Sequence, residues 1–190
     1  MAFTIFVVTF VFVACSQRVY EILFMYKKSE AGEIFARWTI FALAVAYGMF
    51  CCSAIAEYFL VPRKINFIIT ALGVGIYFIC LIIRYWAIKS LGKFRSIHIE
   101  IRKTHEVIKQ GPYKYVRHPI YIEMIFESLS IPLALNSFYT ILLVILTYVP
   151  LVILRAYMED RKMLKKLGER YHRYCKQTGA FIPVKRSIRE

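Results

Sequence analysis

Residues 111–121 read Gly-Pro-Tyr-Lys-Tyr-Val-Arg-His-Pro-Ile-Tyr and place dense polar chemistry directly before an apolar run. The Gly-Pro pair that opens the stretch is a turn signal, because proline fixes φ and glycine relaxes it. Pro119 suits the first position of a helix, where a missing N–H costs nothing. A helix N-terminus carries unpaired N–H groups and partial positive charge. Arg117 and His118 are therefore predicted to stand at the mouth of a helix, in a site for a polar or anionic group at a membrane surface.

The rest of the chain is too apolar for a water-soluble domain. Of its 190 residues 59% are hydrophobic, and the mean hydropathy is +0.53. Apolar runs of about 20 residues are long enough to cross a bilayer. Five such runs are predicted to be membrane spans: residues 2–25, 38–61, 65–88, 119–135 and 138–158. The sequence thus predicts an all-α integral membrane protein with about five transmembrane helices. Residues 1–190 are expected to form a single domain, because the polar segments are too short to bury a core of their own.

Basic residues are distributed unevenly between the ends of these spans. The net charge is +14, and all but Arg63 and Lys64 of the 26 lysines and arginines fall on one side if the chain crosses five times. The positive-inside rule then places the N-terminus outside and the C-terminus in the cytoplasm. Attraction to anionic lipid headgroups explains the charge better than nucleic-acid binding. The bilayer is the expected partner, and no nucleic acid is expected.

Charged side chains lie within or at the ends of several predicted spans. Arg18 and Glu21 are three residues apart, so they form either an interfacial pair or part of a cavity lining. Arg84 is predicted to extend its charge to the membrane surface. Glu123 and Glu127 share a helix face and are costly in lipid unless they meet a cavity or partners. They are candidate general acids or bases, or else they pair with Arg or Tyr from neighbouring spans.

Other local signals concern helix ends and contacts. Glu57 is expected to extend to the surface or pair with Arg63 or Lys64. The Asn-Ser turn at 136–137 makes a helical hairpin of the last two spans, and Pro150 is expected to kink the fifth. Small residues four apart, such as Ala71 and Gly75, are predicted to let spans approach closely. The five cysteines show no metal spacing and are expected to be free, buried thiols.

The polar connection and the tail carry two weaker patterns. The alternation across 96–102 is strand-like but too short to predict a strand. Leucines and tyrosines at helical spacing across 164–174 predict a basic amphipathic helix, suited to a headgroup surface. Gly179 is expected to stand just beyond the end of that helix.

Several of these motifs occur together in one known family. Gly-Pro-Tyr-x3-Arg-His-Pro-x-Tyr at 111–121, the hairpin, Arg-x3-Glu-Asp at 155–160, Leu-Gly-x2-Tyr-x2-Tyr at 167–174 and Ile-Pro at 182–183 resemble the isoprenylcysteine carboxyl methyltransferase family. The related phospholipid N-methyltransferases share part of the pattern. The resemblance covers about residues 85–183. Asp160 departs from it, since a second glutamate is usual there.

The resemblance implies an S-adenosylmethionine-dependent methyltransferase without a Rossmann domain, acting on a lipid-embedded acceptor. The reaction it favours is carboxyl O-methylation of an isoprenylcysteine-like substrate. A cytoplasmic loop, residues 89–118, would wrap the cofactor together with the start of the cytoplasmic tail, which spans residues 159–190. Arg155 would bind the acceptor and act in catalysis together with Glu159. The implied cofactor-binding residues are His98, His105, Glu106, Val107, Ile108, Tyr113, His118, Pro119, Ile120, Tyr121 and Glu159. No metal is implied.

Alternatives remain open at this point. A carboxylate acceptor is already ionised at neutral pH and needs only a cation to orient it, which the planar fork of Arg155 offers. An amine or phospholipid acceptor would need a base, and Glu123 or Glu127 would then become relevant. An NADPH-dependent sterol-type reductase and a non-enzymatic membrane scaffold are further alternatives. The sequence does not identify the acceptor or the oligomeric state.

Overall fold

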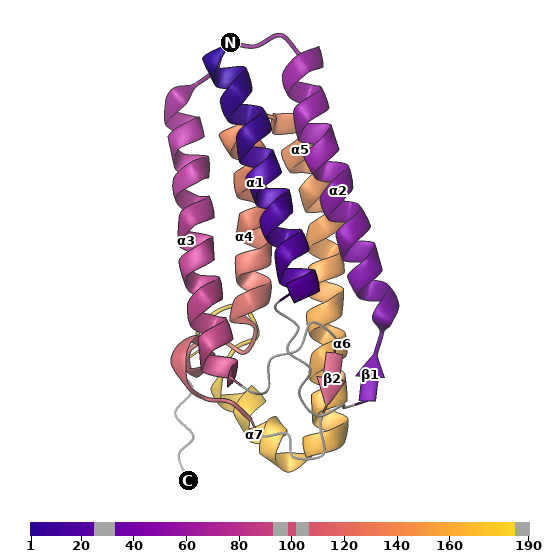
Figure 1. The fold of residues 1–190 in the computed structure, drawn as a ribbon. Coiled ribbons are helices and arrows are strands. Elements are labelled where there is room, and N and C mark those ends of the chain that lie inside the picture. Colours follow the sequence, from indigo (N-terminus) through magenta and orange to yellow (C-terminus); the bar gives the residue numbers. More distant parts are fainter. Residues whose placement is uncertain (25–32, 93–98, 102–106, 185–190) are drawn as a thin grey trace.

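The computed structural model describes residues 1–24, 33–92, 99–101 and 107–184. Helical passes run antiparallel along one axis, so that the N-terminus and the helix at residues 169–177 lie at opposite ends of the bundle (Figure 1). The first four passes are α1 (Ala2–Phe24), α2 (Arg37–Leu60), α3 (Phe67–Leu91) and α4 (Pro119–Ala134). The fifth consists of α5 (Phe138–Leu143), η3 (Val144–Tyr148) and α6 (Val149–Leu167), and α7 (Glu169–Gln177) crosses the lower end.

The helices confirm the all-α membrane fold, with one difference in length. Within the described ranges, four stretches are long and apolar enough to cross a bilayer: Ala2–Glu21, Trp38–Leu60, Phe67–Leu91 and Phe138–Leu167. The predicted span at 119–135 is α4, which has only 16 residues. At 1.5 Å per residue it is about 24 Å long, shorter than the ~30 Å hydrocarbon core. It lies alongside α3 inside the bundle (Figure 1).

Contact between α3 and α4 depends on a glycine that the spacing pattern did not single out. A Cβ added at Gly73 would lie 2.4 Å from the backbone nitrogen of Ala134, whereas one added at Gly75 would meet nothing within 4 Å. The small-residue pair of Ala71 and Gly75 therefore does not make this helix contact. Their side of α3 is exposed, and in a membrane it would face lipid.

The hairpin between α4 and α5 is held by a buried carboxylate. Asn136 adopts a positive φ of 58°, and the N–H of Ser137 donates to the Pro132 carbonyl at 2.8 Å, which closes the predicted turn. Glu57 accepts from the backbone N–H of Thr140 at 2.7 Å and so occupies the start of α5. Its other oxygen pairs with Arg63 at 2.7 Å. The expected partnership of Glu57 with Arg63 is thus confirmed.

The fifth pass changes its hydrogen-bond pattern immediately before Pro150. Val144–Tyr148 forms a π-helical turn, and α6 begins at Val149. Proline has no N–H and its ring crowds the preceding turn. A wider turn is one way in which a helix accommodates such an interruption.

Two short strands join the connections at the lower end. β1 (Glu33–Phe35) pairs antiparallel with β2 (Ile99–Ile101), with Glu33 opposite Ile101. The alternation at 96–102 thus includes a real strand, and its partner carried no sequence signal. All five cysteines are free; Cys51 and Cys80 are buried, whereas Cys52 is exposed, against the expectation of burial.

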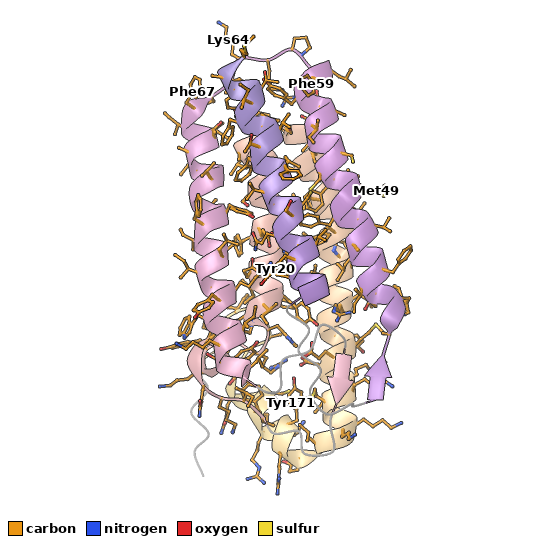
Figure 2. All side chains as sticks on the ribbon, in the orientation of Figure 1. Tyr20, Met49, Phe59, Lys64, Phe67 and Tyr171 are labelled. Atoms are coloured by element: carbon orange, nitrogen blue, oxygen red, sulfur yellow. The ribbon has the colours of Figure 1, made fainter. Side chains whose placement is uncertain are left out.

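The tail folds as two helices rather than one. Gly168 has a positive φ of 54° and separates α6 from α7. Tyr171 and Tyr174 pack with Met163 in a small core of their own, and Figure 2 shows Tyr171 beneath the bundle. The apolar face of this amphipathic helix is therefore buried in the protein, which corrects the interpretation that it lies on headgroups.

Candidate functional site

The Gly-Pro-Tyr motif begins with a tight turn. Residues Gly111–Lys114 form the 3₁₀ turn η2, and Gly111 has a positive φ of 57°. Tyr113 is buried within it, and the Tyr113 carbonyl accepts a hydrogen bond from the Tyr174 hydroxyl at 2.7 Å. The motif is thus tied to α7, which lies 61 residues further along the chain.

The end of the tail pairs with the same loop. The N–H of Arg117 donates to the Gly179 carbonyl at 2.9 Å, and the N–H of His118 donates to the Ala180 carbonyl at 3.1 Å. A Cβ at Gly179 would lie 1.9 Å from the Ile182 carbonyl oxygen, so this close return of the chain requires glycine. As predicted, Gly179 stands just beyond α7, directly after the C-cap residue Thr178. Its φ is not positive, however.

Asp160 connects the loop, α6 and α7, and the sequence patterns had not singled it out for this role. Its Oδ1 lies 2.9 Å from His118 Nε2, and its Oδ2 accepts from Arg117 Nη2 at 2.9 Å. The Tyr171 hydroxyl also donates to Asp160. Burial alone lowers the pKa of Arg117, but the hydrogen bond and charge of Asp160 more than reverse this and raise that pKa. The Arg117–Asp160 pair is therefore ionised.

Four of the predicted cofactor-binding residues converge where α4 begins. The Tyr121 hydroxyl donates to Glu159 Oε2 at 2.6 Å, and the rings of His118 and Tyr121 lie 5.3 Å apart. The charge of Glu159 also acts on the Tyr113 hydroxyl. Burial, followed by that charge, raises the pKa of Tyr113, so its hydroxyl stays neutral. The result is a group of aromatic rings and hydroxyls around one carboxylate.

Pro119 and Ile120 begin α4, with the proline at the predicted first position. Their neighbour His118 precedes the helix, and its side chain makes no capping hydrogen bond. Val107 and Ile108 are half-buried, and Val107 packs against the core of α7. The predicted residues His98, His105 and Glu106 lie outside the described residues.

Arg155 is buried on the inward-facing side of α6, with 5% of its surface exposed. Its guanidinium donates to the Thr39 hydroxyl of α2 and also interacts with the Tyr121 hydroxyl. Thr39 in turn donates to the Ala36 carbonyl at 2.7 Å. Arg155 is thus enclosed by the bundle rather than placed at its surface. The role of Thr39, which sits 116 residues away from Arg155, had no local signal.

A second polar group lies deeper in the bundle, and we call it the buried charge cluster: Arg18 and Glu21 of α1, Arg84 of α3, and Glu123 and Glu127 of α4. Arg84 is buried and contacts all three carboxylates, so the prediction that it reaches the membrane surface is wrong. Arg18 and Glu21 face inward rather than forming only an interfacial pair. The expectation that Glu123 and Glu127 pair with arginines is confirmed.

Comparison with known proteins supports the resemblance. The sequence model of the isoprenylcysteine carboxyl methyltransferase family matches residues 71–165. A protein of Bacillus subtilis (strain 168), the uncharacterized protein YpbQ, is 37% identical over 82 residues, which is 43% of this chain and 49% of that protein. The matched region is thus about half of that relative's length.

A solved structure shows a similar fold. It is that of a eukaryotic intramembrane Ras methyltransferase, an isoprenylcysteine carboxyl methyltransferase, and it superposes with a TM-score of 0.53 at 19% sequence identity. The match covers 77% of this chain and 50% of the other. At this identity the likeness concerns the fold.

Proposed function

The chain belongs to the isoprenylcysteine carboxyl methyltransferase family, and we propose that it transfers a methyl group from S-adenosylmethionine to a membrane-embedded acceptor. The observation that carries the proposal is the convergence of Tyr113, His118, Tyr121 and Glu159 beside Arg155. These side chains come from the matched region and meet at the end of the bundle that carries the tail (Figure 1). By the positive-inside rule that end is cytoplasmic.

The chemistry of the converging residues fits the cofactor. Glu159 offers a carboxylate for amino or hydroxyl groups, and Tyr113 and Tyr121 offer aromatic faces. The start of α4 offers backbone N–H groups and partial positive charge to a carboxylate. Bound S-adenosylmethionine supplies an electrophilic methyl group on a sulfonium. The protein's task is then to orient the acceptor and keep water out, and positioning of this kind supplies much of the rate enhancement.

Arg155 is the residue proposed to orient the acceptor. It is one helical turn from Glu159 on α6, since the two are four residues apart. Its buried guanidinium is fixed by Thr39, and a fixed planar fork binds a carboxylate through two parallel hydrogen bonds. The preferred acceptor is therefore a carboxylate, such as that of a lipidated cysteine at a chain end.

An amine acceptor fits these residues less well. It would have to lose a proton, and the spans offer Glu123 and Glu127 as bases. Both glutamates already accept from arginines of neighbouring helices. Their side chains are also fully buried, so neither group is presented to an incoming amine.

The proposal is tested by methyl transfer from isotopically labelled S-adenosylmethionine in lipid nanodiscs, with two acceptors in separate reactions. We expect labelling of a prenylcysteine analogue, with the label released as methanol by mild base, as from a methyl ester. Labelling of phosphatidylethanolamine that resists base would instead support N-methylation. Binding of NADPH but not S-adenosylmethionine in calorimetry would reject the proposal in favour of a reductase, and binding of neither would favour a scaffold.

A further inference from the structure

The buried charge cluster ties α1 to the α3–α4 pair through one shared guanidinium. Arg84 Nε and Nη2 donate to Glu123 Oε2 at 2.8 and 2.6 Å, and Arg84 Nη1 donates to Glu21 Oε2 at 2.7 Å. Arg84 Nη2 also donates to Glu127 Oε2, which accepts from Arg18 as well. Each arginine thus contacts carboxylates of two helices.

Charges in this cluster do not balance. Among the described residues it holds three carboxylates and two guanidinium groups, which leaves one excess negative charge if all are ionised. The side chains of Glu123 and Glu127 are fully buried. An uncompensated charge in such a place is costly, in protein and in lipid alike.

One oxygen in the cluster is left without a partner. Glu123 Oε1 is buried and accepts no hydrogen bond from any described residue. The Oε2 atoms of Glu123 and Glu127 both accept from Arg84 Nη2, so the two carboxyl groups lie close together. Two carboxylates that share a site do not ionise independently, because the charge of one favours a proton on the other. Because Glu123 Oε1 is sealed from solvent, a proton fits there and a metal ion or headgroup does not.

We propose that the buried charge cluster binds one proton, carried by Glu123, and that this neutral form fixes α1 to α3 and α4. The proposal is independent of methyl transfer. A proton held by the folded protein and released from the unfolded chain makes stability decrease as pH rises above the range in which ordinary glutamates ionise. The titratable and charged groups that face Glu123, or its neighbours Glu127 and Arg84, are Arg18 and Glu21 of α1, Tyr47 of α2, Tyr77, Cys80 and Arg84 of α3, Glu127 of α4 and Tyr148 of η3.

Two matched substitutions separate a protonated from an ionised Glu123. Glu123→Gln replaces a neutral acid by a neutral amide of the same shape, so we expect a melting temperature near that of the parent. We also expect a smaller decrease of that temperature as the pH rises above the range in which ordinary glutamates ionise. Glu127→Gln removes the carboxylate that Arg18 contacts, so we expect a clearly lower melting temperature. Both are measured by thermal unfolding in nanodiscs. If Glu123→Gln destabilises the protein as much as Glu127→Gln does, Glu123 is ionised and the proposal is wrong.

Infrared spectroscopy of the parent protein gives a second test that does not depend on the folding of a variant. At neutral pH we expect the carbonyl band of a protonated carboxylic acid, shifted in heavy water and lost in Glu123→Gln. Absence of this band from the parent would overturn the proposal, as would its persistence in a folded Glu123→Gln protein.

Discussion

At the scale of single residues, Arg155 is the clearest test of the proposed chemistry. Lysine offers a point charge without the planar fork that binds a carboxylate through two hydrogen bonds. We expect Arg155→Lys to keep the fold and the cofactor affinity but to lose about 10²-fold in kcat/KM, or ~2.7 kcal/mol, a typical cost for a misplaced orienting group. Steady-state transfer to a prenylcysteine analogue measures this, with melting curves recorded alongside.

The matched control is Arg161→Lys, because Arg161 is exposed on the same helix. We expect it to be silent in both assays. Full activity in Arg155→Lys would reject a carboxylate held by two hydrogen bonds and would favour an amine acceptor. If Arg155→Lys were active and Arg155→Ala only lowered the melting temperature, the role of Arg155 would be structural.

His118 is the second residue to test, because its ring lies beside Tyr121 at the proposed cofactor site. We expect His118→Ala to weaken the binding of S-adenosylhomocysteine by roughly 1–3 kcal/mol, the cost of a lost buried hydrogen bond. Calorimetric titration measures it, and Tyr115→Ala, an exposed position in the same loop, is the control. A folded His118→Ala protein with unchanged affinity would remove His118 from the site.

Asp160 is predicted to matter for stability rather than for binding. It accepts hydrogen bonds from His118, Arg117 and Tyr171. An amide has only one acceptor oxygen and no negative charge, so it cannot accept all three equally well. Hydrogen bonds to charged groups contribute about 1.5–3 kcal/mol each, so we expect Asp160→Asn to lower the free energy of unfolding by at least about 1 kcal/mol. Thermal unfolding measures this against Glu169→Gln, an exposed position on α7. Equal melting temperatures for the two variants would show that Asp160 does not hold the loop, α6 and α7 together.

At the scale of helices, the contact between α3 and α4 depends on Gly73. We expect Gly73→Ala to destabilise the protein by about 1–3 kcal/mol, because a methyl group there meets the backbone of Ala134 and overpacks the contact. Gly75→Ala is the matched control two residues away, where the added methyl group meets nothing. Alanine favours a helix over glycine by up to about 1 kcal/mol, so this control should be neutral or slightly stabilising. Similar losses in both variants would contradict the close contact at Gly73.

The positions of the helices could be predicted from the sequence, because they depend on local apolar runs. The partners of each helix could not. Glu57 was matched correctly with Arg63, which lies six residues away. Arg84 was expected to reach the membrane surface because it stands near the end of a span. Its actual partners, Glu21 and Glu123, are 63 and 39 residues away. No pattern along one helix states which other helix lies beside it.

At the scale of the whole molecule, the residues of the candidate site were predictable, but their contacts across the fold were not. Tyr113, His118, Tyr121 and Glu159 were taken from a family motif, and the fold brings them together at the start of α4. Residue spacing alone would not have joined Glu159 to Tyr121, because 38 positions separate them. The tail was expected to help enclose the cofactor, but the hydrogen bond from Tyr174 to the loop was not predicted, since Tyr174 meets the loop only after the chain turns back.

The orientation of the bundle in the membrane is the last prediction, and it follows from the distribution of charge over its two ends. Basic residues concentrate at the end with α7, so that end should be cytoplasmic. Lys64 at the opposite end and Lys176 on α7 are both exposed (Figure 2 labels Lys64), whereas Asn136 of the outer turn is buried and unsuitable for a probe. In intact cells, a maleimide that cannot cross the membrane should label Lys64→Cys above the parent background but leave Lys176→Cys unlabelled until the cells are permeabilised. Labelling of Lys176→Cys alone in intact cells would invert the topology and place the proposed site outside the cytoplasm.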